Sequence, residues 1–154
     1  MKQLLPLLLI LFVLGCKQDV KNAAGAGSNV SESADLNVQL MCEDIGSTDE
    51  RPHFGVYLIV NNSKTKIKEI AVACEVLDSA QFANYEIPAE ALAAVGGWWA
   101  GAGDYFYARK IGEKVIVYYA GVDEAMAEPG YPYEVIATYE NGKFSVEIPK
   151  MEAE

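Results

Sequence analysis

From residue 36 onward, apolar and polar side chains follow one another in short runs. In residues 36–42 and 70–76, apolar side chains occupy every second position. A period of two is typical of a β-strand that buries one face and leaves the other in water. Residues 54–60 are apolar on both faces, which predicts a central strand. The same reasoning predicts four more strands, over residues 105–111, 115–120, 133–139 and 144–148.

Turn-forming residues separate these runs. The polar residues 61–65 lie between the second predicted strand and the third. Asn141 and Gly142 join the last two strands, and this dipeptide suits a type I′ hairpin turn because both of its residues take positive φ. Gly112 and Glu113 are expected to close the hairpin before it.

One short helix is predicted between the third strand and the fourth. Pro88 is suited to a first helical position, residues 89–95 are mostly alanine and other apolar residues, and Gly96 is suited to the stop. Seven short strands and one short helix within about 115 residues predict a single mainly β domain over residues 36–154. We expect an antiparallel sandwich or a partly open barrel.

The first 15 residues have a different pattern. Lys2 gives a cationic start, and an apolar run follows through Leu14. About 20 apolar residues are needed to cross the hydrocarbon core of a bilayer, so this run is too short for a membrane-spanning anchor. Residues 1–15 are therefore interpreted as a secretory signal peptide.

The end of this segment, Val13, Leu14, Gly15 and Cys16, resembles the lipobox of bacterial lipoproteins. The resemblance implies that the signal is cut before Cys16 and that this cysteine carries acyl chains. A plain secretory signal that is cut at another bond is the alternative. Two or more acyl chains, at about 0.8 kcal/mol per buried methylene, would hold the protein on a membrane almost permanently.

Residues 16–35 form the expected lipidated tether. Its side chains are mostly small, polar or charged and cannot bury enough apolar surface to offset the entropy of ordering. As a flexible coil, this segment has a reach on the order of 25 Å. Residues 17–19 resemble the charged export signal of Bacteroidetes surface lipoproteins, and residues 88–107 resemble small exported proteins of such bacteria. We therefore expect a lipid-anchored protein of the bacterial cell envelope, on the periplasmic or surface face of the outer membrane.

The net charge limits the partners. Lys and Arg number 12 against 22 Asp and Glu, which gives −10, and loss of Lys2 with the signal gives −11. Nucleic acids and anionic lipid surfaces attract basic proteins, so this balance argues against both. The acidic residues are spread along the chain, as on an ordinary solvated surface.

The chain has three cysteines. Once Cys16 is acylated, Cys42 and Cys74 are the two that remain. Both lie on the apolar phase of their predicted strands, and disulfides persist in exported proteins. We expect a Cys42–Cys74 disulfide, with two separate buried thiols as the alternative. A metal site is not expected, because His53 is the single histidine and no cysteine pair has zinc-ligand spacing.

Residues 96–107, GGWWAGAGDYFY, concentrate large rings among glycine and alanine. We interpret them as a glycine-rich aromatic loop, for which two roles are open. It could be a stacking platform for a sugar ring or an inserted partner residue, with a carboxylate as hydrogen-bond acceptor. It could instead be a tight loop whose tryptophans plug the open end of the β-structure. Both roles hold if one indole points inward and the other outward. The candidate binding residues are Trp98, Trp99, Asp104, Tyr105 and Tyr107.

Catalytic motifs are not recognisable. No serine lies in a Gly-x-Ser-x-Gly motif, and the adjacent Asp123 and Glu124 would converge only in a loop. We therefore expect no enzyme and no cofactor, but a non-catalytic binding module that contacts a glycan or an envelope protein. The alternative is a structural accessory subunit of an envelope complex. A catalytic role of Asp104, or of Asp123 with Glu124, is the third and least favoured hypothesis.

Overall fold

The computed structural model describes residues 36–123, 125 and 130–147. They lie within one unit that begins at Ala34. The signal peptide, the tether with Cys16, and Glu124 lie outside the described residues. The described part contains nine strands and one 3-10 turn: β1 Val38–Asp44, β2 Phe54–Val60, β3 Ser63–Ile70, β4 Ala73–Val76, η1 Phe82–Tyr85, β5 Ala93–Trp99, β6 Ala102–Ile111, β7 Lys114–Asp123, β8 Glu134–Glu140 and β9 Lys143–Val146.

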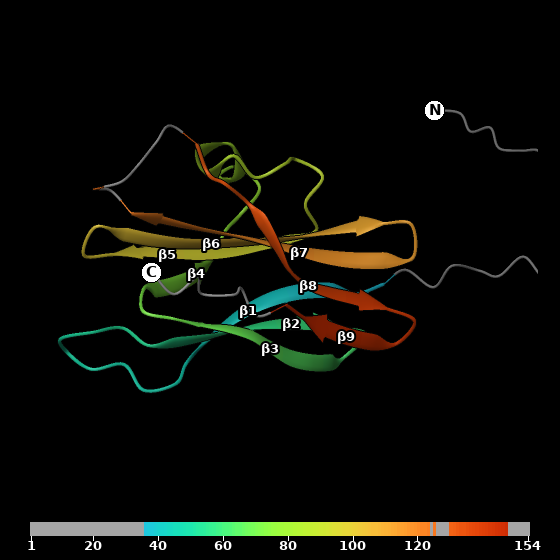
Figure 1. The fold of residues 1–154 in the computed structure, drawn as a ribbon, viewed down its shortest axis with the longest axis horizontal. Helices are drawn as coiled ribbons and strands as arrows, with labels where there is room; N and C mark the ends of the chain where they lie inside the picture. Colours follow the sequence, from blue (N-terminus) through green and yellow to red (C-terminus); the bar gives the residue numbers. More distant parts are fainter. Residues whose placement is uncertain (1–35, 124, 126–129, 148–154) are drawn as a thin grey trace, which may run out of the picture. The chain divides into compact units, whose positions relative to one another are not determined.

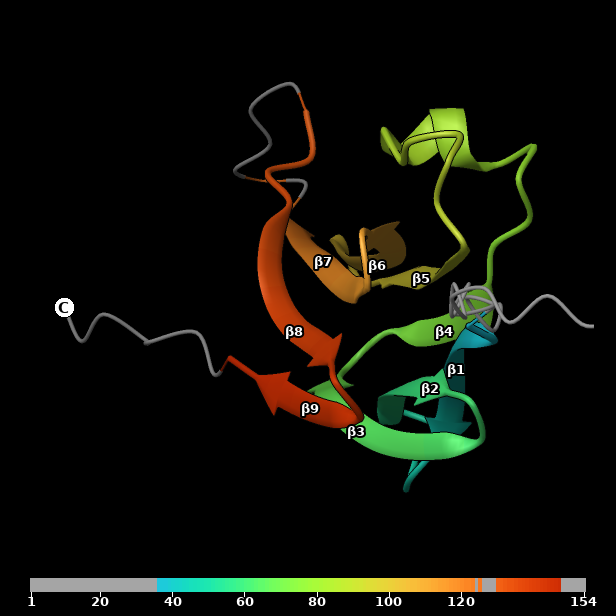
Figure 2. The ribbon, with the colours of Figure 1, turned by 90° about the vertical axis from the view of Figure 1, so that its right-hand side faces the viewer.

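These strands form two antiparallel sheets (Figure 1). The smaller sheet has the order β1-β2-β3, and the larger is a six-stranded meander from β4 to β9. Figure 2 shows β8 curving out of the layer of β6 and β7, so that the β8–β9 hairpin lies beside β3. In the described residues no strand pairing joins the two sheets, so the structure is sandwich-like and is not a closed barrel. The predicted mainly β, antiparallel fold is confirmed.

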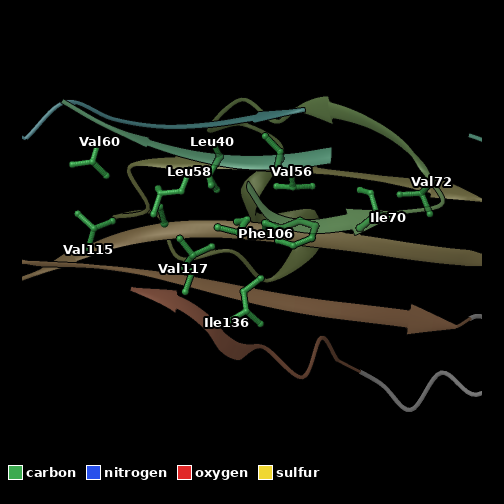
Figure 3. Packing of buried hydrophobic residues seen from close by; sticks show 14 residues of the cluster. Leu40, Val56, Leu58, Val60, Ile70, Val72, Phe106, Val115, Val117 and Ile136 are labelled. Carbon is green, nitrogen blue, oxygen red and sulfur yellow. The ribbon is translucent and has the colours of Figure 1, made fainter. Parts of the chain in front are cut away.

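The main core lies between the two sheets (Figure 3). Its side chains come from alternate positions of β2, β6 and β7, as the period of two predicts. Phe106 is the largest side chain that is fully buried. The remaining core residues that Figure 3 labels are Leu40, Val56, Leu58, Val60, Ile70, Val72, Val115, Val117 and Ile136.

A second apolar cluster covers the opposite face of the larger sheet. We call the face that carries Phe106 the inner face and the face that carries Tyr105 the outer face. The segment between β4 and β5 packs on the outer face through Leu77, Phe82 and Ile87. The centre of β6 is therefore buried on both faces.

The predicted helix over residues 88–95 is wrong. Ala91 donates its N–H to the carbonyl of Pro88 in a single turn, and β5 then begins at Ala93. A helix this short is marginal without tertiary support, whereas a strand here buries Ala94 in the outer cluster and Val95 in the core. The small alanines pack equally well on either side of a sheet, so the sequence shows no alternation.

Hairpin turns explain the other boundary changes. Asn61 and Asn62 both have positive φ, 48° and 67°, and form a two-residue turn. As a result β3 begins at Ser63. A bend at residues 71 and 72 divides the strand expected over residues 70–76 between β3 and β4. The turn predicted at Asn141 and Gly142 is confirmed by φ values of 52° and 76°.

A disulfide between Cys42 and Cys74 is present, with the Cα atoms 5.9 Å apart. Cys42 lies on β1 and Cys74 on β4, which are edge strands of different sheets. The bond therefore joins the two sheets covalently along one side.

Candidate functional site

The aromatic segment is a β-hairpin and not a loop. Trp98 and Trp99 end β5, and β6 begins at Ala102. Ala100 and Gly101 form the two-residue turn, with φ values of 50° and 88°. Positive φ at both residues is typical of type I′ turns, whose twist matches that of the flanking strands. We call residues 96–104 the tryptophan hairpin.

The two indoles lie on opposite faces of the sheet. Consecutive strand residues alternate between faces, so Trp98 lies on the outer face and Trp99 on the inner face. Their exposed fractions are 41% and 43%. Each ring is partly covered and partly exposed, with one indole on each face of the sheet.

Glycines make room for the ring on the outer face. A Cβ at Gly103 would lie 2.5 Å from Cε3 of Trp98 and 2.8 Å from Cε2 of Tyr105. A Cβ at Gly96 would collide with the Tyr105 ring in the same way. The rings therefore lie flat on bare backbone, which holds Trp98 in position while part of its surface faces the solvent.

Tyr105 and Tyr107 are buried, with 4% and 6% of their surface exposed. Both belong to a cluster of tyrosines on the outer face. The ring centroids of Tyr105 and Tyr85 are 4.4 Å apart, and those of Tyr107 and Tyr118 are 4.8 Å apart, both stacked. Burial raises the pKa of Tyr105 to about 12. These two candidates stabilise the second cluster, and little of their surface can reach a ligand.

Asp104 lies on the inner face, away from Trp98. Its Oδ1 accepts a hydrogen bond from the hydroxyl of Tyr119 at 2.6 Å. The ammonium of Lys68 on β3 lies 4.5 Å from the centroid of the Tyr119 ring. Burial raises the pKa of Asp104, while the Tyr119 hydrogen bond and the charge of Lys68 oppose that rise. The structure thus divides the five candidates among an exposed pair, a buried pair and an inner-face carboxylate.

Asp123 joins this inner face, which sequence reasoning did not predict. It ends β7 and pairs in register with Ala102. Ala102 in turn pairs with Trp99. The predicted turn at Gly112 and Glu113 sets this register, because residues 102 and 123 are equally far from it, but the strands expected over residues 105–111 and 115–120 were too short to include the pair.

His53 lies in an open hollow of about 380 Å³ beside the β1–β2 loop. Its Nε2 is 3.4 Å from Oε2 of Glu69, and Glu69 also pairs with Lys66. Close to half of the surface of the His53 and Glu69 side chains is exposed. Among the described residues no group of three or more His, Cys, Asp and Glu side chains is placed to hold a metal ion.

No protein-family model matches the chain, and no curated protein and no solved structure shows significant similarity to it. Within the described part of the chain, no helix is long and apolar enough to cross a membrane.

Proposed function

We propose that this chain is a lipid-anchored protein of the bacterial cell envelope, and that it works as a non-catalytic binding module through its tryptophan hairpin. The lipobox-like residues 13–16 and the polar residues 17–35 support the anchor and the tether. The partner is a glycan or an envelope protein.

The observation that carries the binding role is the exposure of both tryptophans at the end of an ordered hairpin. Trp98 is held against Gly103, so it is not an unrestrained side chain. A large ring that is fixed in advance loses little conformational entropy when a partner covers it. Aromatic side chains are also the residues that most often dominate binding energy at interfaces.

The non-catalytic role is proposed from the sequence, in which no serine lies in a Gly-x-Ser-x-Gly motif and no other catalytic motif is recognisable.

Site-specific photo-crosslinking tests the binding role. A photoreactive amino acid at position 99 should yield a specific adduct in intact envelopes of the source cells. Ile111 is the matched control, because it is 49% exposed and lies at the other end of β6. Adducts of equal yield at both positions, or none at position 99, would contradict the proposal.

The same adducts separate the binding module from an accessory subunit. A module that exchanges partners should lose its adduct when excess unlabelled protein is added before irradiation. A permanent subunit should keep the adduct and copurify with its complex in constant proportion.

Mass spectrometry of the N-terminal peptide tests the anchor separately. We expect a mature chain that begins at Cys16 and carries acyl chains. A Cys16→Ala variant should then move from the detergent phase to the aqueous phase on partitioning. An unmodified Cys16, or cleavage at another bond, would overturn the anchor.

A further inference from the structure

Charge is distributed unevenly along β6 and β7. Both carboxylates of these strands, Asp104 and Asp123, lie at the end of the sheet that carries the tryptophan hairpin. The three cations, Arg109, Lys110 and Lys114, lie at the opposite end, beside the β6–β7 turn. Figure 1 shows these two ends at the left and right of the larger sheet. The exposed tryptophans therefore lie at the end of the sheet that carries the carboxylates of β6 and β7, where Lys68 of β3 is the cation beside Asp104.

Trp99, Ala102 and Asp123 form one row across three strands. Their register pairs are Trp99 with Ala102 and Ala102 with Asp123, so the three side chains share the inner face. Neighbouring strands are about 4.8 Å apart, so the backbones of Trp99 and Asp123 are roughly 10 Å from each other. Ala102, whose side chain is a methyl group, lies on the strand between them. A side chain this small leaves space on the inner face for a side chain of a partner.

The two carboxylates at this end differ in their surroundings. Asp104 lies one row further inward, with Tyr119 and Lys68 beside it. Asp123 is exposed, and its Oδ1 accepts the backbone N–H of Ala125 at 2.9 Å. That bond fixes the direction of the Asp123 carboxylate at the rim of the hairpin.

We propose that the partner of the tryptophan hairpin is a protein segment that places an arginine or lysine side chain between Trp99 and Asp123. This inference rests on the proposed function and names the chemistry of its partner. A cation over an indole is attracted by the ring, and a carboxylate beside it adds a charge-assisted hydrogen bond. The net charge of −10 favours the approach of a basic partner. A neutral glycan would stack on the ring and donate a hydroxyl hydrogen bond to the carboxylate, but it would not gain the attraction between opposite charges.

Titration of the full-length protein in nonionic detergent tests this inference. The probes are a short peptide of repeating glycine, serine and arginine, the same peptide with glutamate in place of arginine, and a neutral chito-oligosaccharide. Tryptophan fluorescence reports binding, because Trp98 and Trp99 are the two tryptophans of the chain. We expect the arginine peptide to bind, and its Kd to rise with salt.

Two variants and one control locate the site. Asp123→Asn and Trp99→Ala should each weaken binding of the arginine peptide by about tenfold. Glu113→Gln removes the same charge from an exposed turn at the far end of β6, and it should change Kd by less than about twofold.

The outcomes separate this inference from the proposed function. Equal effects of Asp123→Asn and Glu113→Gln would mean attraction by net charge only and would overturn the inference. Preferential binding of the oligosaccharide or the glutamate peptide would overturn it as well. Crosslinking from position 99 could still succeed after either of these outcomes. The tryptophan hairpin would then remain a binding site, but for a partner without the proposed arginine or lysine.

Discussion

The hydroxyl of Tyr119 donates a hydrogen bond to Oδ1 of Asp104 across β6 and β7 at 2.6 Å. The bond places a carboxylate against a half-buried ring on the inner face. Burial raises the pKa of both groups, and the hydrogen bond adds to the rise at Tyr119 while it opposes the rise at Asp104.

The pH dependence of stability should report this relationship. Because the folded protein holds the Asp104 proton more tightly than the unfolded chain, this group favours folding at low pH. That contribution is lost as the pH rises from the ordinary value of 3.8 through the raised pKa. The unfolding free energy of the native chain minus that of Asp104→Asn should therefore increase as the pH falls from 7 toward 3. Urea unfolding at a series of pH values measures it, and a difference independent of pH would contradict the assigned burial.

The disulfide should stabilise the folded protein, and the effect should appear in the unfolding free energy. Cys42 and Cys74 are 32 residues apart in the sequence, and a crosslink of this span contributes about 3 kcal/mol. Reduction should lower the unfolding free energy by that amount. A variant with alanine at both positions should be equally unstable and insensitive to reductant. Equal stability of the oxidised and reduced protein would show that the crosslink does not hold the two sheets together.

Gly97 should tolerate no side chain. A Cβ at this position would collide with the backbone carbonyl of Ala73 on β4, and backbone cannot rotate away. Gly97→Ala should therefore cost about 3 kcal/mol or more. Gly112→Ala is the control, because nothing lies within 4 Å of the added Cβ and only the positive φ opposes the change. That control should lower the unfolding free energy by about 1 kcal/mol. Thermal unfolding of both variants makes the comparison, and equal losses for the two variants would contradict the close approach of β4 to β5.

Pattern reasoning worked where one residue type fixes the local geometry. The alternation of Leu40 and Cys42, and the turn at Asn141 and Gly142, follow from backbone rules that act within a few residues. It failed over residues 88–95, where the alanines fit a helix and a strand equally well. There the burial of Ala94 and Val95 on two faces decides the outcome, and such burial depends on distant parts of the chain.

The sequence predicted which residues form the candidate site, but it did not predict which of them are exposed and which are buried. Trp98 and Trp99 stood out because large rings are rare among glycines, and both rings are exposed. Tyr105 and Tyr107 looked equivalent to them in the sequence. The outer cluster, which is contributed by the segment between β4 and β5, buries these tyrosines, and no short-range pattern reveals that cover.

Truncation of the tryptophans should affect stability less than truncation of the core. Phe106→Ala removes a fully buried ring and should cost about 3 to 5 kcal/mol. Trp98→Ala or Trp99→Ala should cost about 2 kcal/mol, because each ring buries only part of its surface. Chemical denaturation of the three variants gives the comparison. Equal losses for Trp99 and Phe106 would mark the indole as part of the core.

Quenching of tryptophan fluorescence by acrylamide tests the central claim most directly, because the two tryptophans of the chain both lie in the hairpin. The account predicts that the native, unbound protein is quenched about half as strongly as the unfolded chain, because 41% and 43% of the two tryptophans are exposed, and that a bound partner lowers the quenching further. Strong protection in the unbound native protein would show that the rings are already covered, and it would contradict a hairpin that is free to bind.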